Sequence, residues 1–275
     1  MNAPATAPRA AAPSPLVQRG DSDGIALVVL NRPQTRNTLS EAMLTALTET
    51  FAAIADDKRV RAVVLSANGP AFCAGHDLKE ITDHRQDTDG GRAYVQDIMD
   101  RCSAMMQSIH RMPPPVVAAV EGVATAAGCQ LIASCDLAIA SQTARFATPG
   151  VHIGLFCTTP SVALSRNVAP KHAMEMLLTG DRISADEAQR IGLVNRVVEP
   201  GSEADAALAL ARKIAEKSTL TVKIGKAAFY RQREMPLAEA YRYASQVMTE
   251  NMMARDAEEG ICAVLDKRAP RWEDR

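Results

Sequence analysis

The chain has 275 residues, 47% of them hydrophobic and 23% charged, and its formal net charge is −1. This composition is typical of a soluble globular protein with a substantial core. The small net charge gives no global electrostatic case for binding nucleic acid or a membrane surface, and no apolar run approaches the roughly 20 residues of a membrane helix. We therefore expect neither nucleic acid nor a membrane as a partner.

Six cysteines are scattered along the sequence, with no CxxC pair and no His/Cys spacing suited to zinc. They predict reduced, mostly buried thiols and no metal site. The first 16 residues are rich in Ala and Pro and lack the apolar core of a secretion signal. This predicts a disordered tail on a cytoplasmic protein. Organelle targeting by the tail stays open, because Arg9 and Arg19 are the only charged residues among the first 20.

Strands and helices are predicted to alternate along the first two thirds of the chain. Apolar, β-branched runs predict strands at 24–30, 60–66, 116–120, 137–140 and 193–198. Helical spacing predicts helices at 40–55 and 94–112, the first capped by Ser40, and a capping box at 184–187 begins another. Their predicted buried faces are Met43, Leu44, Leu47, Phe51 and Ile54, and Ile98, Cys102, Met105, Ile109 and Met112. The alternation indicates an α/β fold.

The end of the chain differs, because residues 203–266 have a helical pattern throughout. We expect a tail over 1–16, an α/β core over 17–200 and a helical region over 201–275. That last region would cover a site or make a subunit contact. No linker requires two independent domains.

Two segments have the form of an oxyanion hole. They are FCAGHDLKE (72–80), which follows a strand and a turn, and TAAGCQLIA (125–133), which leads from a strand into a helix. Gly75 allows close backbone approach in the first segment. The second lies at a helix N-terminus, where free amides and the helix dipole favour negative charge. One N–H from each could stabilise one carbonyl oxygen, although close packing alone is the simpler explanation of the spacing.

Several long motifs resemble the enoyl-CoA hydratase/isomerase (crotonase) family over residues 17–275. They are LNRPQTRNTLS (30–40), AFCAGHDLKE (71–80), PVVAAVEGVATAAGCQLIASCDLAIA (115–140), AMEMLLTGDRISADEAQRIGLVNRVV (173–198) and the terminal DKR (266–268). The runs ATAAGCQLIASCDLAIAS and FATPGVHIGLFCTTPSVAL resemble one branch of it more narrowly. The resemblance implies a crotonase spiral of ββα units with a C-terminal helical subdomain, assembled as a homotrimer or a dimer of trimers.

It also implies an acyl-CoA thioester as ligand, as in fatty acid metabolism, with coenzyme A belonging to the substrate and no tightly bound cofactor. The backbone N–H groups of His76 and Ala127 would hold the thioester oxygen. Along the CoA arm would lie His76, Asp77, Leu78 and Lys79. Lys267 would reach the adenosine phosphate from the C-terminal helix of the same or a neighbouring subunit. For each lysine, a solvated surface charge is an equal alternative.

The sequence departs from the family at both hydratase glutamates, whose positions hold Gln130 and Gly150. Hydration needs one group to take a proton from water and another to supply a proton to the α-carbon. Glutamine has no proton to exchange near neutral pH, and glycine has no side chain. Because each lost group costs about 10²–10⁴ in rate, we expect weak hydration, and we expect Gln130→Glu with Gly150→Glu to raise it. Ala127 replaces a usual glycine but keeps its N–H.

His152 as a base and Cys157 as a nucleophile are candidate replacements for the missing acids. The competing interpretation is that both are packed pocket residues. Three hypotheses follow: an acyl-CoA enzyme with another reaction, such as thioester hydrolysis, isomerisation or decarboxylation; a catalytically silent acyl-CoA-binding or regulatory protein; and a true enoyl-CoA hydratase with an unplaced base. The sequence leaves open whether the chain is an enzyme.

Overall fold

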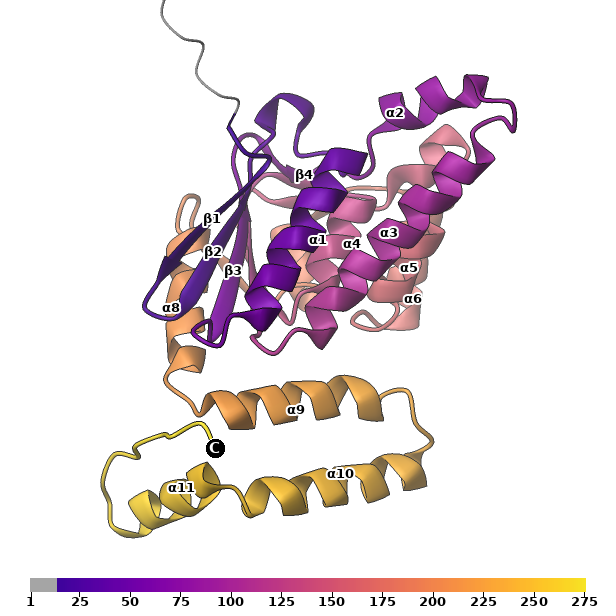
Figure 1. The fold of residues 1–275 in the computed structure, drawn as a ribbon. Helices are drawn as coiled ribbons and strands as arrows, with labels where there is room; N and C mark the ends of the chain where they lie inside the picture. Colours follow the sequence, from indigo (N-terminus) through magenta and orange to yellow (C-terminus); the bar gives the residue numbers. More distant parts are fainter. Residues whose placement is uncertain (1–13) are drawn as a thin grey trace, which may run out of the picture.

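The computed structural model describes residues 14–275 (Figure 1). Most of the predicted N-terminal tail, residues 1–13, lies outside the described residues. Strands and helices alternate through most of the chain and give way to helices at its C-terminal end. The predicted α/β class is therefore confirmed.

The strands form two sheets. A six-stranded sheet has the order β1–β2–β3–β5–β7–β10, and a four-stranded sheet has the order β4–β6–β8–β9. The bounds are β1 Val17–Ser22, β2 Ile25–Leu30, β3 Ala62–Ala67, β4 Ala71–Cys73, β5 Val116–Val120, β6 Val123–Thr125, β7 Leu137–Ser141, β8 Arg145–Ala147, β9 Ile183–Ser184 and β10 Arg196–Val198. The pairs β3/β4, β5/β6 and β7/β8 each give one strand to each sheet, so the chain advances as a spiral of ββα units.

The helices follow the strand pairs and then continue alone. Their bounds are α1 Glu41–Asp56, α2 Leu78–Asp83, α3 Arg92–Arg111, α4 Ala127–Ser134, α5 Thr158–Leu164, α6 Pro170–Thr179, α7 Ala185–Arg190, α8 Glu203–Ala215, α9 Thr219–Gln232, α10 Leu237–Met252 and α11 Arg255–Leu265, with short 3-10 helices at Pro33–Thr35, His84–Gln86 and Pro149–Ile153.

Helices cover the six-stranded sheet on both faces (Figure 1). On one face, Val63 and Leu65 of β3 join the core cluster to which α1 and α3 contribute. On the other, Val64 packs in a second cluster with Ala207 and Ala211 of α8. Alternate side chains of a strand point to opposite faces. Burial on both sides therefore explains why β5 is apolar at every position.

Most predicted elements are confirmed. The Ser40 side chain accepts a hydrogen bond from the Met43 amide at 3.2 Å, and Ser184 accepts one from the Glu187 amide at 3.1 Å, so both serines cap helices as expected. Both predicted apolar stripes are buried. The strand predicted at 193–198 is confined to its last three residues, because the Leu193 amide still donates to the Ala188 carbonyl of α7.

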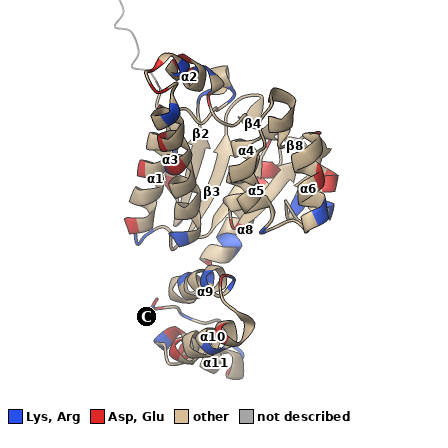
Figure 2. Cartoon of the chain, turned by 90° about the vertical axis from the view of Figure 1, so that its right-hand side faces the viewer, with Lys and Arg blue, Asp and Glu red and all other residues tan. Residues whose placement is uncertain are grey.

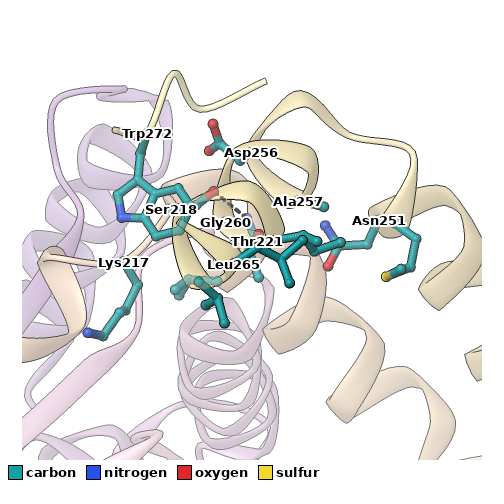
Figure 3. A pocket seen from close by; sticks show the side chains of 13 residues that line it. Lys217, Ser218, Thr221, Asn251, Asp256, Ala257, Gly260, Leu265 and Trp272 are labelled. Atoms are coloured by element: carbon teal, nitrogen blue, oxygen red, sulfur yellow. Dashed lines mark hydrogen bonds between the residues drawn. The ribbon is translucent and has the colours of Figure 1, made fainter. Parts of the chain in front are cut away.

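The C-terminal helices α9–α11 lie below the α/β body (Figures 1 and 2). Helix α8, which the predicted boundary at residue 201 assigns to this region, packs instead on the six-stranded sheet. Large apolar side chains are exposed on α10 and α11, among them Leu237, Tyr241, Met248, Val264 and Leu265. A cavity of about 660 Å³ lies among α9, α10, α11 and Trp272 (Figure 3).

Candidate functional site

The two predicted oxyanion segments lie against each other. Gly75 has a φ of +90°, and a Cβ built on it would lie 3.4 Å from the Ala127 nitrogen and 3.0 Å from the Ala126 Cβ. The Thr125 hydroxyl donates to the Ala74 carbonyl at 3.2 Å, which joins the same two segments. A side chain at this position would be crowded by its neighbours and strained by the positive φ. The backbone before His76 is therefore next to the amide of Ala127.

Hydrogen bonding indicates where the His76 amide points. The Gly75 carbonyl accepts from the Leu39 amide at 2.8 Å. In a trans peptide the C=O and the following N–H point in opposite directions, so the His76 N–H faces away from Leu39. In the loops and turns of residues 14–275, neither His76 nor Ala127 donates a backbone hydrogen bond.

The amide of Ala127 opens helix α4, where the first N–H groups have no partner within the helix. Ala126 makes the turn from β6 into the helix with φ 51° and ψ −119°, a backbone conformation that L residues rarely adopt. Ala127 itself is not among the residues with positive φ, so its methyl group adds no backbone strain. A Cβ on Gly128 would lie 2.1 Å from the Cys73 carbonyl oxygen, so α4 begins pressed against β4.

The two positions where the family has glutamates differ in the space around them. Gln130 is 5% exposed, its Oε1 is buried without a hydrogen-bond partner, and it lines a cavity of about 710 Å³. Gly150 has no room for a side chain. A Cβ there would lie 2.8 Å from the Leu155 carbonyl oxygen and 2.9 Å from the Cys157 Sγ. The segment is thus folded around the absence of a side chain at residue 150.

His152 lies in a different hollow from Gln130, and Cys157 lies beside Gly150. The His152 ring packs on Gly180 and lines a separate hollow of about 450 Å³, which shares no lining residue with the Gln130 cavity. Cys157 is buried beside Gly150, and burial raises the pKa of its thiol although the Gly150 amide opposes the shift. A raised pKa favours the thiol over the nucleophilic thiolate.

The candidate CoA contacts lie mainly on the rim of the site. The Asp77 carboxylate caps α2 through the Lys79 amide at 3.1 Å and accepts from the Thr38 hydroxyl at 3.2 Å. Leu78 and Lys79 are exposed. The His76 ring Nε2 is buried without a partner, and burial lowers the pKa of this ring to about 4. The imidazole is therefore neutral at pH 7.

Lys267 is far from these residues within one chain. It follows α11, which lies at the opposite end of the molecule from α2 in both views (Figures 1 and 2). A CoA contact that combines Lys79 with Lys267 would need two subunits.

Several polar residues of the Gln130 cavity were not predicted from the sequence. His110 of α3 and Tyr230 of α9 stack with ring centroids 4.0 Å apart, and both line the cavity. Burial lowers the pKa of His110, although the nearby Asp136 carboxylate opposes the shift. The signal in the sequence was weak. His110 adjoins the apolar stripe of α3, but nothing in the pattern places α9 beside it.

Residues 14–275 contain neither a membrane-spanning helix nor a group of metal ligands. No helix there is long and apolar enough to span a bilayer. No three His, Cys, Asp or Glu side chains there are grouped so as to hold a metal ion.

Comparison with known proteins identifies the fold and the family. A family model described as enoyl-CoA hydratase/isomerase matches residues 20–275. The chain is 48% identical over 250 residues to human enoyl-CoA hydratase domain-containing protein 3, mitochondrial, covering 91% of this chain and 81% of the human protein. The crystal structure of that human protein superposes with a TM-score of 0.88 at 46% identity, covering 94% of this chain and 100% of the other.

A crystal structure described as enoyl-CoA hydratase from Mycobacterium smegmatis is similar as well. It is 52% identical, with a TM-score of 0.89, and the match covers 94% of this chain and 99% of the other. These likenesses confirm the predicted crotonase fold and the narrower resemblance to the branch of enoyl-CoA hydratase domain-containing protein 3. The chain therefore belongs to the enoyl-CoA hydratase/isomerase family.

Proposed function

We propose that the chain binds an acyl-CoA thioester with its carbonyl oxygen between the N–H groups of His76 and Ala127. These donors would stabilise an enolate or a tetrahedral oxyanion in a reaction other than efficient 2-enoyl-CoA hydration. The supporting observation is the close approach of the Gly75 backbone to the Ala127 nitrogen. Fixed backbone donors need no reorganisation as charge develops on the oxygen, so they favour the transition state over the ground state.

Weak hydration follows from the residues opposite that oxygen. Gln130 accepts and donates hydrogen bonds but does not exchange a proton near neutral pH. The space at Gly150 is filled by the Leu155 carbonyl and the Cys157 sulfur. A true hydratase would need a base from elsewhere, and His152 lines a different hollow.

A catalytically silent acyl-CoA-binding protein is the second candidate. It is favoured by the filled space at Gly150 and by the raised pKa of the Cys157 thiol. With these two features, the backbone N–H groups could still bind the thioester, but the site would lack an acid, a base and a nucleophile. This protein would sequester the thioester or report its concentration.

Coenzyme A would belong to the substrate, with no cofactor held tightly. Its arm would lie along Asp77, Leu78 and Lys79, and Lys267 would contact the adenosine phosphate from a neighbouring subunit. Because α10 and α11 expose large apolar side chains, a homotrimer or a dimer of trimers would bury them and bring the two lysines together.

Location in the cell is a separate proposal. The names of five vertebrate relatives carry the word mitochondrial. Those names favour organelle import over the cytoplasmic location predicted from composition. Subcellular fractionation of the native host would decide between the two.

The test of the proposed function measures binding and turnover in one preparation. Purified protein is titrated with saturated and 2-unsaturated acyl-CoAs by calorimetry. The same samples are then followed for loss of crotonyl-CoA and for release of free thiol. We expect binding, and crotonyl-CoA hydration at least about 100-fold slower than an authentic hydratase assayed in parallel.

Each outcome has one meaning. Hydration as fast as that of the authentic enzyme overturns the proposed loss of hydratase chemistry. Binding without turnover across a broad thioester panel favours the silent binder over the enzyme. Failure to bind any acyl-CoA overturns both.

A further inference from the structure

The Gln130 cavity leads away from the proposed thioester site. Its lining follows α4 from Gln130 to Ser134 and continues to Tyr230 of α9. Ala127, whose amide faces the thioester, is seven residues before Ser134, a distance of about 10 Å along the helix axis. The far end of the cavity is therefore where the end of a bound acyl chain would lie.

The lining of this cavity is positively charged. It contains four arginines, Arg111, Arg166, Arg231 and Arg233, against a single acid, Glu234. The excess of three positive charges stands out in a chain whose formal net charge is −1. An aliphatic chain alone would pack against such groups at a cost in their solvation.

Three of these arginines, Arg111, Arg231 and Arg233, lack an acidic partner in the described part of the chain. Arg166 already pairs with Glu234 at 3.5 Å. Within residues 14–275, neither Arg231 nor Arg233 forms an ion pair. Arg231 lies over the Tyr243 ring at 4.7 Å, and Arg233 lies over the Phe229 ring while donating to the Arg166 carbonyl. Each guanidinium keeps donors for an anion, because it carries five N–H groups in a planar fork.

Hydrogen bonds fix the part of the cavity wall that Tyr230 forms. The Tyr230 hydroxyl donates to the Asp136 carboxylate at 2.9 Å, and Lys226 donates to the same carboxylate at 2.7 Å. These groups use one another's hydrogen-bonding capacity. Arg111 donates to the side-chain oxygen of Gln107 on its own helix at 2.6 Å. Arg231 and Arg233 are thus the lining arginines without a side-chain hydrogen-bond acceptor among residues 14–275.

We propose that the acyl group of the ligand ends in a second carboxylate, which Arg231 and Arg233 bind at the far end of the Gln130 cavity. The ligand class is then a CoA monothioester of a dicarboxylic acid. This inference rests on the proposed function, since it assumes that the thioester lies between His76 and Ala127. Carboxylates and guanidinium groups form charge-assisted, often bidentate hydrogen bonds, which gives the site selectivity.

The test compares matched acyl-CoAs that differ only at the far end of the chain. Dissociation constants are measured by calorimetry for hexanoyl- and adipoyl-CoA, octanoyl- and suberoyl-CoA, and decanoyl- and sebacoyl-CoA. For at least one length we expect the ω-carboxyl form to bind roughly tenfold or more tightly. The preference should shrink at high salt, because the pair lies near solvent.

Variants then assign the preference to its residues. Arg231→Gln and Arg233→Gln should each reduce the ratio of the two dissociation constants toward one. Lys223→Gln, which removes an exposed charge from the same helix, should leave the ratio unchanged. Thermal unfolding of each variant verifies that the fold is retained.

The outcomes separate this inference from the proposed function. Equal affinity for both members of every pair overturns the inference and leaves the proposed function standing. A preference that survives both arginine substitutions overturns the assignment to Arg231 and Arg233. Failure of every acyl-CoA to bind overturns the proposed function and this inference with it.

Discussion

Gly75 lies directly against the start of α4, and a methyl group at Gly75 would be 3.4 Å from the Ala127 nitrogen. The contact joins two loops that are about fifty residues apart in the sequence, one after β4 and one after β6. These strands are parallel neighbours in the four-stranded sheet, so their C-terminal ends emerge side by side. The sheet thus positions the two N–H groups proposed to hold the thioester oxygen.

Gly75→Ala tests that contact. The methyl would press on the Ala126 Cβ at 3.0 Å, and alanine would strain a φ of +90°. We expect acyl-CoA affinity to fall at least about tenfold, with a loss of stability of about 1–2 kcal/mol. Gly201→Ala is the matched control, since Gly201 also has positive φ but a Cβ there would meet nothing within 4 Å. If both variants bind acyl-CoA like the parent chain, the contact has no role in binding.

Sequence patterns predicted the parts of the fold that bury a repeating apolar face. The stripes of α1 and α3 and the uniformly apolar β5 are examples. In each, the spacing of the apolar residues along the sequence predicts which faces are buried. Strand β1 was missed, because VQRGDS pairs only at the edge of the sheet and carries no apolar alternation. The strands of the second sheet were missed because each has three residues or fewer, too few to show an alternating pattern.

The candidate site was predictable only in part. The motifs around Gly75 and Ala127 indicated two segments, and the structure brings these segments together. The cavity beyond Gln130 was not predictable, because its charged end comes from α9. No local sequence pattern predicts which face of a C-terminal helix packs against α3. The lack of space at Gly150 could not be predicted from the sequence either, because it depends on where the fold places the Leu155 carbonyl.

Restoring the two glutamates is now expected to fail, contrary to the expectation from sequence. A side chain at Gly150 would start 2.8 Å from the Leu155 carbonyl oxygen, and backbone does not move as cheaply as a side-chain tip. We expect Gly150→Glu to lower the free energy of unfolding by about 1–3 kcal/mol. The double variant with Gln130→Glu should hydrate crotonyl-CoA no faster than Gln130→Glu alone.

The control for that experiment is Gly20→Glu, which adds the same side chain where a Cβ meets nothing within 4 Å. Its melting temperature should match that of the parent chain. A rise in crotonyl-CoA hydration of tenfold or more in the double variant, relative to Gln130→Glu, would show that the segment around Gly150 can open.

Stability should depend on pH through His76. Burial lowers the pKa of this ring from 6.5 to about 4. Between these values the unfolded chain binds a proton that the folded chain does not, so the free energy of unfolding falls as the pH drops through this window. The contribution amounts to at most about 3 kcal/mol. Urea unfolding at pH 7 and pH 4.5 should show a smaller loss for His76→Gln than for the parent chain.

His172→Gln on α6 is the comparison for the pH experiment. It removes a histidine outside the candidate site, so an effect confined to His76→Gln belongs to the site. An identical slope for His76→Gln and the parent chain between pH 7 and pH 4.5 would contradict the assignment to His76.

The ion pair between Lys226 and Asp136 should anchor α9 to the α/β body. The two side chains are 6% and 12% exposed and approach to 2.7 Å, and the carboxylate also accepts from the Val116 amide at 2.7 Å. Lys226→Met would leave a buried carboxylate without its cation, so we expect a loss of about 3–5 kcal/mol in urea unfolding. Lys223→Met, on the exposed face of the same helix, should change stability by less than about 0.5 kcal/mol.

A double-mutant cycle distinguishes this coupling from lost packing. Asp136→Asn removes the charge that Lys226 compensates, so Lys226→Met should cost less in the Asp136→Asn background than in the parent chain. The difference isolates the interaction between the two side chains. Because Tyr230 donates to the same carboxylate at 2.9 Å, the single Lys226→Met variant should also disturb the wall of the Gln130 cavity. Additive losses in the cycle would mean that α9 is held by its apolar contacts and that the buried pair contributes no net coupling.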